Sequence, residues 1–126
     1  MTCVARRRWL AVGLWAAAQL TLTSLPARNL PAGIGHPWDW LAHAAMYAVL
    51  GVLVARAAAL DGGSGRRLVL VFVLVALAGA LDELHQILIP GRDPSFADWA
   101  CDVVGAGAGL TTGRRMMASA VARWLR

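Results

Sequence analysis

The residues of this chain that could do chemistry are concentrated in two stretches. The first, Asp82–Asp102 (DELHQILIPGRDPSFADWACD), holds five carboxylates with a histidine, a glutamine and an arginine. The second, Asp39–Tyr47 (DWLAHAAMY), places an acid, a histidine and a tyrosine four residues apart, which is one face of a helix. One chemistry open to them is acid–base catalysis, with His43 as a general base oriented by Asp39 and Glu83 as a buried acid. Alternatively, His43 is a core histidine bonded to Asp39.

Several of these side chains also have a purely structural explanation. Asp98 follows Ser95 by three residues, a spacing typical of a capping box at a helix start. Asp39 is expected in a first helical turn, where a carboxylate suits the helix dipole. Asp82 and Glu83 differ, because they come at the end of an apolar segment, where the dipole disfavours carboxylates. We therefore expect a functional or network role for this pair.

The composition indicates a protein embedded in lipid. The chain has 126 residues, enough for one domain, and 59% of them are hydrophobic. Only 15% are charged, whereas soluble domains carry about 25%. The formal net charge of +5 would suit nucleic acid, but the basic residues bracket the apolar runs instead of forming a patch. We therefore expect no nucleic-acid partner.

Four apolar segments predict the elements that position these residues. They span residues 9–25, 38–60, 68–89 and 96–112. A helix that crosses a bilayer needs roughly 20 mainly apolar residues. The sequence thus predicts an all-α integral membrane bundle of four transmembrane helices. A cleaved signal peptide for the first segment and a soluble helical bundle for the whole chain are the alternatives, and we favour neither.

The charges sort to opposite ends of the predicted helices. Four spans place ten arginines on one side: Arg6, Arg7, Arg8, Arg56, Arg66, Arg67, Arg114, Arg115, Arg123 and Arg126. They place six of the seven acids on the other side. Positive residues mark the cytoplasmic side, so we expect both termini there. Residues 1–8 would be a basic cytoplasmic N-terminus, 9–113 the membrane domain, and 114–126 a basic tail that is either amphipathic or frayed.

The polar groups fall at matching depths. We take Pro37, Pro90 and Ser95 as the outer ends of three helices. At about 1.5 Å per residue, one layer lies roughly 9–10 Å inside: His43, Glu83 and Asp102. Asp39, Gln86 and Asp98 lie nearer the ends, and buried ionisable groups in a membrane usually face one another or a wet cavity. The predicted ligand-binding residues are Asp39, His43, Tyr47, Asp82, Glu83, Gln86, Arg92, Asp98 and Asp102.

Small residues in the fourth segment predict close helix packing. Gly105 and Gly109 form a Gly-x-x-x-Gly pattern, which lets two helices approach closely. The short spans must crowd together to bury Asp102, so packing within the chain is the expected use. A homo-oligomer formed through Gly105 and Gly109 is the alternative.

Together these stretches resemble the signature of the VanZ-like family. That pattern runs Asp-Glu-x-x-Gln, Pro-Gly-Arg, Asp, a polar residue and Gly-x-x-x-Gly, and DELHQILIPGRDPSFADWACDVVGAGAG is similar to it. DWLAHAAMYAVLG resembles the family's Asp-Lys-x-x-His-Phe-x-x-Tyr-x-x-Leu-Gly motif. The resemblance extends over about residues 9–113. Its motif positions fall on Asp39, His43, Tyr47, Glu83, Gln86, Arg92 and Asp98.

The resemblance implies a small multi-pass protein of the bacterial inner membrane, linked to low-level resistance to the glycopeptide teicoplanin. This chain departs from the pattern at three positions. Trp40 replaces the usual Lys, Ala44 the usual Phe, and Asp102 the usual Asn. The site is therefore more negative than the pattern, so the ligand preference of the family does not carry over directly.

Three functions fit these observations, and binding is our main prediction. An outward-facing acidic pocket would bind a cell-envelope lipid or a lipid-tailed glycopeptide, with no metal or cofactor. The second is an intramembrane enzyme acting on an envelope lipid, with His43, Glu83 and Arg92 as catalytic residues and Arg92 holding a phosphate. A divalent metal held by His43, Glu83 and Asp102 would supply that enzyme with a nucleophilic water. The third is a polar network that only joins the helices.

Overall fold

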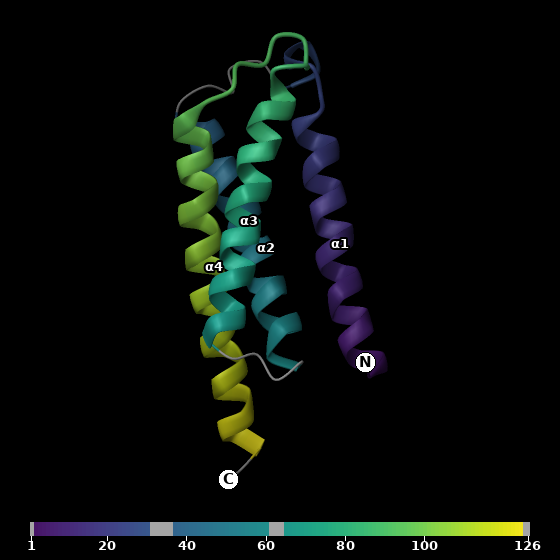
Figure 1. Cartoon of the computed structure of the whole chain (residues 1–126), viewed down its shortest axis with the longest axis vertical. Coiled ribbons are helices and arrows are strands. Elements are labelled where there is room, and N and C mark those ends of the chain that lie inside the picture. Colours follow the sequence, from purple (N-terminus) through teal and green to yellow (C-terminus); the bar gives the residue numbers. More distant parts are fainter. Residues whose placement is uncertain (1, 31–36, 61–64, 125–126) are drawn as a thin grey trace.

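The computed structural model is a bundle of helices, and it describes residues 2–30, 37–60 and 65–124. Over these residues it has no β-strand. The helices are α1 (Cys3–Thr23), α2 (Trp38–Leu60), α3 (Gly65–Gln86) and α4 (Phe96–Trp124), with a 3₁₀ turn at Ala27–Asn29. Successive helices run in opposite directions, so α1 starts and α4 finishes at the same end of the bundle (Figure 1). The predicted all-α fold with four helices is confirmed.

We name the two ends of the bundle by their charge. The polar end is where α1 and α3 finish and α2 and α4 begin, and it holds the buried acids (Figure 1). The basic end is where α1 and α3 begin, and Arg8 and Arg66 lie there. The alternation of the helices therefore separates the two kinds of charge along the bundle axis, as the sequence predicts.

Three helices, α1, α3 and α4, differ in their limits from the apolar segments. α1 begins at Cys3 instead of Trp9, because the Thr2 hydroxyl accepts a hydrogen bond from the Ala5 N–H (3.2 Å) and caps the helix ahead of the arginines. α3 ends at Gln86 because the chain then makes a tight turn before α4. Gly91 completes this turn at φ +76°, a left-handed conformation that glycine adopts without strain.

α4 is longer than its apolar segment. The predicted tail continues the helix in line as far as Trp124, past the ends of its neighbours (Figure 1). Alanine, methionine and arginine are good helix formers, and no proline interrupts them. Arg8 of α1 donates to the Met117 sulfur (3.7 Å), so α1 contacts the tail. Residues 125–126 and the side chains of Val121 and Trp124 lie outside the described residues.

Glycines bring α2 and α4 into direct backbone contact. A Cβ added to Gly105 would clash with the carbonyl of Ala44, and one added to Gly109 would clash with that of Ala48. Gly51 of α2 has the same relation to Ala106 of α4. Both glycines of the Gly-x-x-x-Gly pattern are buried inside this chain. They therefore pack against α2 within this chain.

The apolar outer surface supports association with a membrane. Among the described helices, residues 38–58 of α2 and the whole of α3 are long and apolar enough to cross a bilayer. α3 turns a row of large side chains outward, and Leu74, Leu81 and Leu84 are each more than half exposed. Contiguous apolar surface on this scale is unusual for a protein in water. α1 and α4 are not apolar enough to count as membrane-crossing helices by composition, because α1 begins with arginines and α4 carries Asp98 and Asp102.

Candidate functional site

The polar end gathers buried ionisable and amide side chains from three helices. His43 comes from the second turn of α2, Glu83 and Gln86 from the last turn of α3, and Asp98 and Asp102 from the start of α4. Each is less than 10% exposed, and Asp102 is fully buried. The interior farther along the bundle is apolar. The polar groups are therefore a local feature of this end.

His43 pairs with Asp102 of α4. The distance from His43 Nδ1 to Asp102 Oδ1 is 2.9 Å, and both side chains are buried. The other carboxylate oxygen, Oδ2, is buried without a hydrogen-bond partner. Gly79 of α3 leaves room for it, since a Cβ there would lie 3.2 Å from Oδ2. From the sequence, Asp39 was predicted to orient His43. The hydrogen bond that orients His43 in the structure is to Asp102 of α4. This helix lies close to α2 because of its glycines.

Glu83 joins the end of α3 to the start of α4. Its Oε2 accepts the Ser95 backbone N–H (2.7 Å), and its Oε1 accepts from Gln86 Nε2 (3.4 Å). Ser95 in turn caps α4 by accepting the Asp98 N–H on its hydroxyl (3.3 Å). The dipole of α3 gives no reason for a carboxylate at Glu83. The start of α4 does, because Glu83 satisfies a backbone donor at the α4 N-terminus, where a carboxylate is favourable.

Arg92 is fixed by an amide and not by a carboxylate. Its Nε and Nη2 both donate to Gln86 Oε1, at 3.2 and 3.0 Å. Gln86 is 1% exposed and lies between Glu83 and Arg92, so it orients both. Within the part of the chain that the structure describes, no hydrogen bond or ion pair joins Arg92 to an acid. Its charge is therefore not neutralised by a contacting carboxylate.

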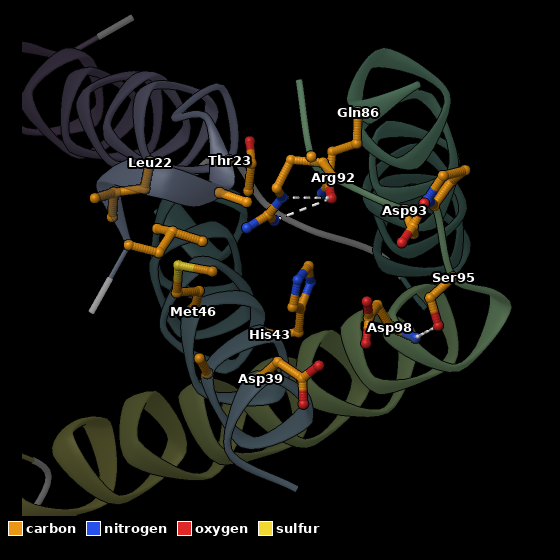
Figure 2. A pocket seen from close by; sticks show the side chains of 15 residues that line it. Leu22, Thr23, Asp39, His43, Met46, Gln86, Arg92, Asp93, Ser95 and Asp98 are labelled. Atoms are coloured by element: carbon orange, nitrogen blue, oxygen red, sulfur yellow. Dashed lines mark hydrogen bonds between the residues drawn. The ribbon is translucent and has the colours of Figure 1, made fainter. Parts of the chain in front are cut away.

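A cavity of about 550 Å³ opens above these groups. The side chains of His43, Arg92 and Asp98 point into the same space (Figure 2). Asp39 and Gln86 also line it, and Leu22, Leu30 and Met46 form an apolar wall. That volume is within the usual range for small-molecule sites, which is about 300–1,000 Å³. Among the described residues, the cavity thus combines one arginine, several acids and an apolar side.

Four of the nine predicted ligand-binding residues do not line this cavity: Glu83 and Asp102, described above, and two that lie elsewhere. Asp82 and Tyr47 line a separate cavity of about 280 Å³ beside α1, together with Gln19 and His85. Asp82 accepts a hydrogen bond from the Thr23 hydroxyl at 2.8 Å. Consecutive helical residues point about 100° apart, and here Asp82 faces Thr23 of α1 while its neighbour Glu83 faces Ser95 ahead of α4. The nine predicted residues therefore do not form a single pocket.

The sequence analysis missed the contribution of α1. Gln19 and Thr23 are buried polar residues on one face of this helix, four residues apart. Ser24 contacts the His85 ring at 3.1 Å. The spacing of polar residues along an otherwise apolar helix was the signal that could have identified them. Ser95 was predicted only as a helix cap. Its backbone N–H donates to Glu83, and a backbone contact of this kind cannot be recognised from residue types.

Three of these side chains could hold a metal ion. Ligand atoms of His43, Glu83 and Asp102 lie within 4.8 Å of one another, and all three residues are buried. Independently of a metal, the buried His43–Asp102 pair resembles the oriented imidazole that general-base catalysis requires. Cys101, which precedes Asp102 in α4, carries a free thiol and is partly exposed. The arrangement is thus equipped for proton transfer or metal binding.

No family model, curated protein or solved structure matches this chain. The fold and the site therefore define the protein by their own geometry. It is a small helical bundle with two helices able to cross a membrane and a cavity lined by acids and one arginine at the polar end.

Proposed function

We propose that this is a four-span protein of the bacterial inner membrane that binds the headgroup of an envelope amphiphile in the cavity at its polar end. Arg92 would contact an anionic group such as a phosphate. Asp39 and Asp98 would contact an amine or hydroxyl groups of the same headgroup. The apolar wall at Leu22 and Met46 would receive the beginning of an acyl chain.

The four-span arrangement is supported by where the less apolar helices put their polar groups. Asp98 and Asp102 of α4 and Gln19 and Thr23 of α1 are all buried. The lipid-facing sides of these helices are correspondingly apolar, with exposed residues such as Leu14, Leu20 and Val104. With the arginines cytoplasmic, the polar end faces the periplasm.

One observation carries the proposal above all others. The Arg92 guanidinium lines a cavity that also holds carboxylates, and it is oriented by a fully buried amide. A protein that needed Arg92 only for stability would pair it with one of the nearby acids. When a neutral group orients an arginine, the positive charge of the guanidinium stays available to an anionic ligand.

Binding to purified protein tests the proposal. The chain in nanodiscs would be titrated with fluorescent analogues of phosphatidylethanolamine and phosphatidylglycerol. Arg92→Gln should weaken binding by about ten-fold or more, the effect of losing one charge-assisted hydrogen-bonding pair. Arg114→Gln, which removes the same charge at the other end of the bundle, should leave affinity unchanged. Equal affinities for the two variants would rule out the cavity as the binding site.

A role in glycopeptide resistance follows from the VanZ-like resemblance and from the acyl tail that teicoplanin-type drugs carry. We propose it as a consequence of the same cavity. Bacteria expressing the chain should tolerate more teicoplanin than cells with an empty vector, and Arg92→Gln at equal protein level should abolish the difference. Unchanged susceptibility with normal expression would exclude the resistance role and leave lipid binding to be judged by the titration.

Catalysis on an envelope lipid is the second candidate, favoured by the His43–Asp102 pair at 2.9 Å. His43 would act as a general base oriented by Asp102, below the headgroup held by Arg92. Thin-layer analysis of lipids incubated with the protein and with His43→Ala would detect turnover. A lipid product that forms with both proteins equally would eliminate this role for His43.

A further inference from the structure

A cluster of three buried ligand-type side chains lies beneath the cavity. His43, Glu83 and Asp102 come from α2, α3 and α4, and one ligand atom from each lies within 4.8 Å of the others. We propose that these three residues bind one divalent transition-metal ion. This site is independent of the lipid proposed above, because the ion would be held by the protein whether or not the cavity is filled.

The distances fit a shared ion. In an octahedral site, ligand atoms at about 2.0–2.2 Å from a metal lie about 3.0 Å apart when adjacent and about 4.3 Å apart when opposite, and in a tetrahedral site they lie about 3.4 Å apart. His43 Nδ1 and Asp102 Oδ1 are 2.9 Å apart, which matches adjacent ligands. The 4.8 Å limit for the whole set exceeds the opposite spacing by about 0.5 Å, which small side-chain rotations can close.

The charge and hydrogen bonding of the cluster also call for a cation. Asp102 is fully buried and its Oδ2 has no hydrogen-bond partner. Glu83 is buried nearby, while the positive charge of Arg92 is directed at Gln86. Two buried carboxylates without a strong cation are costly in a low-dielectric interior. A divalent ion that the Asp102 carboxylate binds through both of its oxygens would offset both formal charges and give Oδ2 a partner.

The ligand set and its surroundings indicate the type of ion. One imidazole and two carboxylates suit Zn²⁺ or Mn²⁺, whereas Ca²⁺ prefers six to eight oxygens. Ser95 and Gln86 hydrogen-bond to Glu83, as outer residues do to orient a metal-bound carboxylate. Because His43 also lines the cavity, the remaining coordination positions would open toward it.

Metal titration of the whole chain in detergent tests the proposal. Protein stripped with a chelator and dialysed would be titrated with Mn²⁺, followed by electron paramagnetic resonance, and with Zn²⁺, followed by calorimetry. We expect one ion per chain. Asp102→Asn and Glu83→Gln preserve shape and should each weaken binding about ten-fold or more, as should His43→Ala.

Asp82→Asn is the matched control. Asp82 is a buried acid next to Glu83 in the sequence but lies in the other cavity, so its replacement should leave affinity unchanged. Circular dichroism and gel filtration would confirm that each variant is folded. If His43→Ala does not fold, the affinities of Glu83→Gln and Asp102→Asn test the proposal. The proposal is overturned if the wild-type chain binds neither ion, or if Asp82→Asn weakens binding as much as Asp102→Asn does.

Discussion

Replacing Gly109 by alanine tests the close packing of α2 on α4, which brings His43 and Asp102 together. Gly109 faces the backbone of Ala48 on α2. Gly13 of α1 is the matched position, because no atom lies within 4 Å of the place where its Cβ would be. The same substitution therefore adds one methyl group to a helical glycine in two opposite environments.

Two terms set the size of the effect. Alanine is favoured over glycine in a helix interior by about 0.5–1 kcal/mol, and Gly13→Ala should gain this amount. At Gly109 the new Cβ would lie 2.8 and 2.9 Å from the carbonyl carbon and Cα of Ala48, where carbon atoms prefer about 3.5–4.0 Å. Overpacking costs about 1–3 kcal/mol. The upper part of that range applies at Gly109, because the atoms that the new Cβ meets belong to the Ala48 backbone, which cannot rotate away as a side chain can. The net loss for Gly109→Ala is then about 1–2 kcal/mol.

Stability would be measured by titrating the detergent-solubilised protein with sodium dodecyl sulfate and following the fluorescence of its six tryptophans. We expect the unfolding midpoint to fall for Gly109→Ala and to rise slightly for Gly13→Ala, with a difference of about 2–3 kcal/mol between the two. If Gly109→Ala is as stable as Gly13→Ala, the helices do not meet at these glycines and the geometry of the site would have to be redrawn.

Two further predictions concern α1 and the topology. Thr23→Val keeps the shape of the side chain but removes the donor to Asp82, and it should destabilise the protein by about 1–3 kcal/mol. Thr21→Val, at an exposed position of the same helix, should have little effect, and equal unfolding midpoints for the two would contradict the buried bond. In a background without native cysteines, Asp93→Cys should react with a membrane-impermeant maleimide added to intact spheroplasts, whereas Arg66→Cys should react only after lysis. Labelling of both from outside would exclude the four-span topology.

The depth of the polar groups could be predicted from the sequence. Proline and serine mark the outer helix ends, and the rise of a helix is nearly constant. His43, Glu83 and Asp102 were thus assigned to one layer, and their ligand atoms lie within 4.8 Å of one another in the structure. The limits of α2 also agree with its apolar segment, Trp38–Leu60.

The direction in which each side chain points could not be predicted in the same way. It depends on the rotation of a helix about its axis, and packing against other helices sets that rotation. The sequence therefore grouped Asp82 with Glu83, although Asp82 lines the cavity beside α1 and Glu83 binds the Ser95 N–H ahead of α4. Asp39 was named as the partner of His43 because the two are close in sequence, whereas the partner found, Asp102, depends on how α2 and α4 pack.

The bond from Glu83 to the Ser95 N–H has a consequence for biogenesis. α4 carries two acids and is not apolar enough to count as a span by composition. The backbone N–H of Ser95, the residue that caps α4, is nevertheless satisfied by α3, and unsatisfied backbone donors are costly in lipid. In the four-span topology proposed above, α3 and α4 would therefore be suited to enter the bilayer together as a hairpin, with the strongly apolar α3 compensating for the less apolar α4.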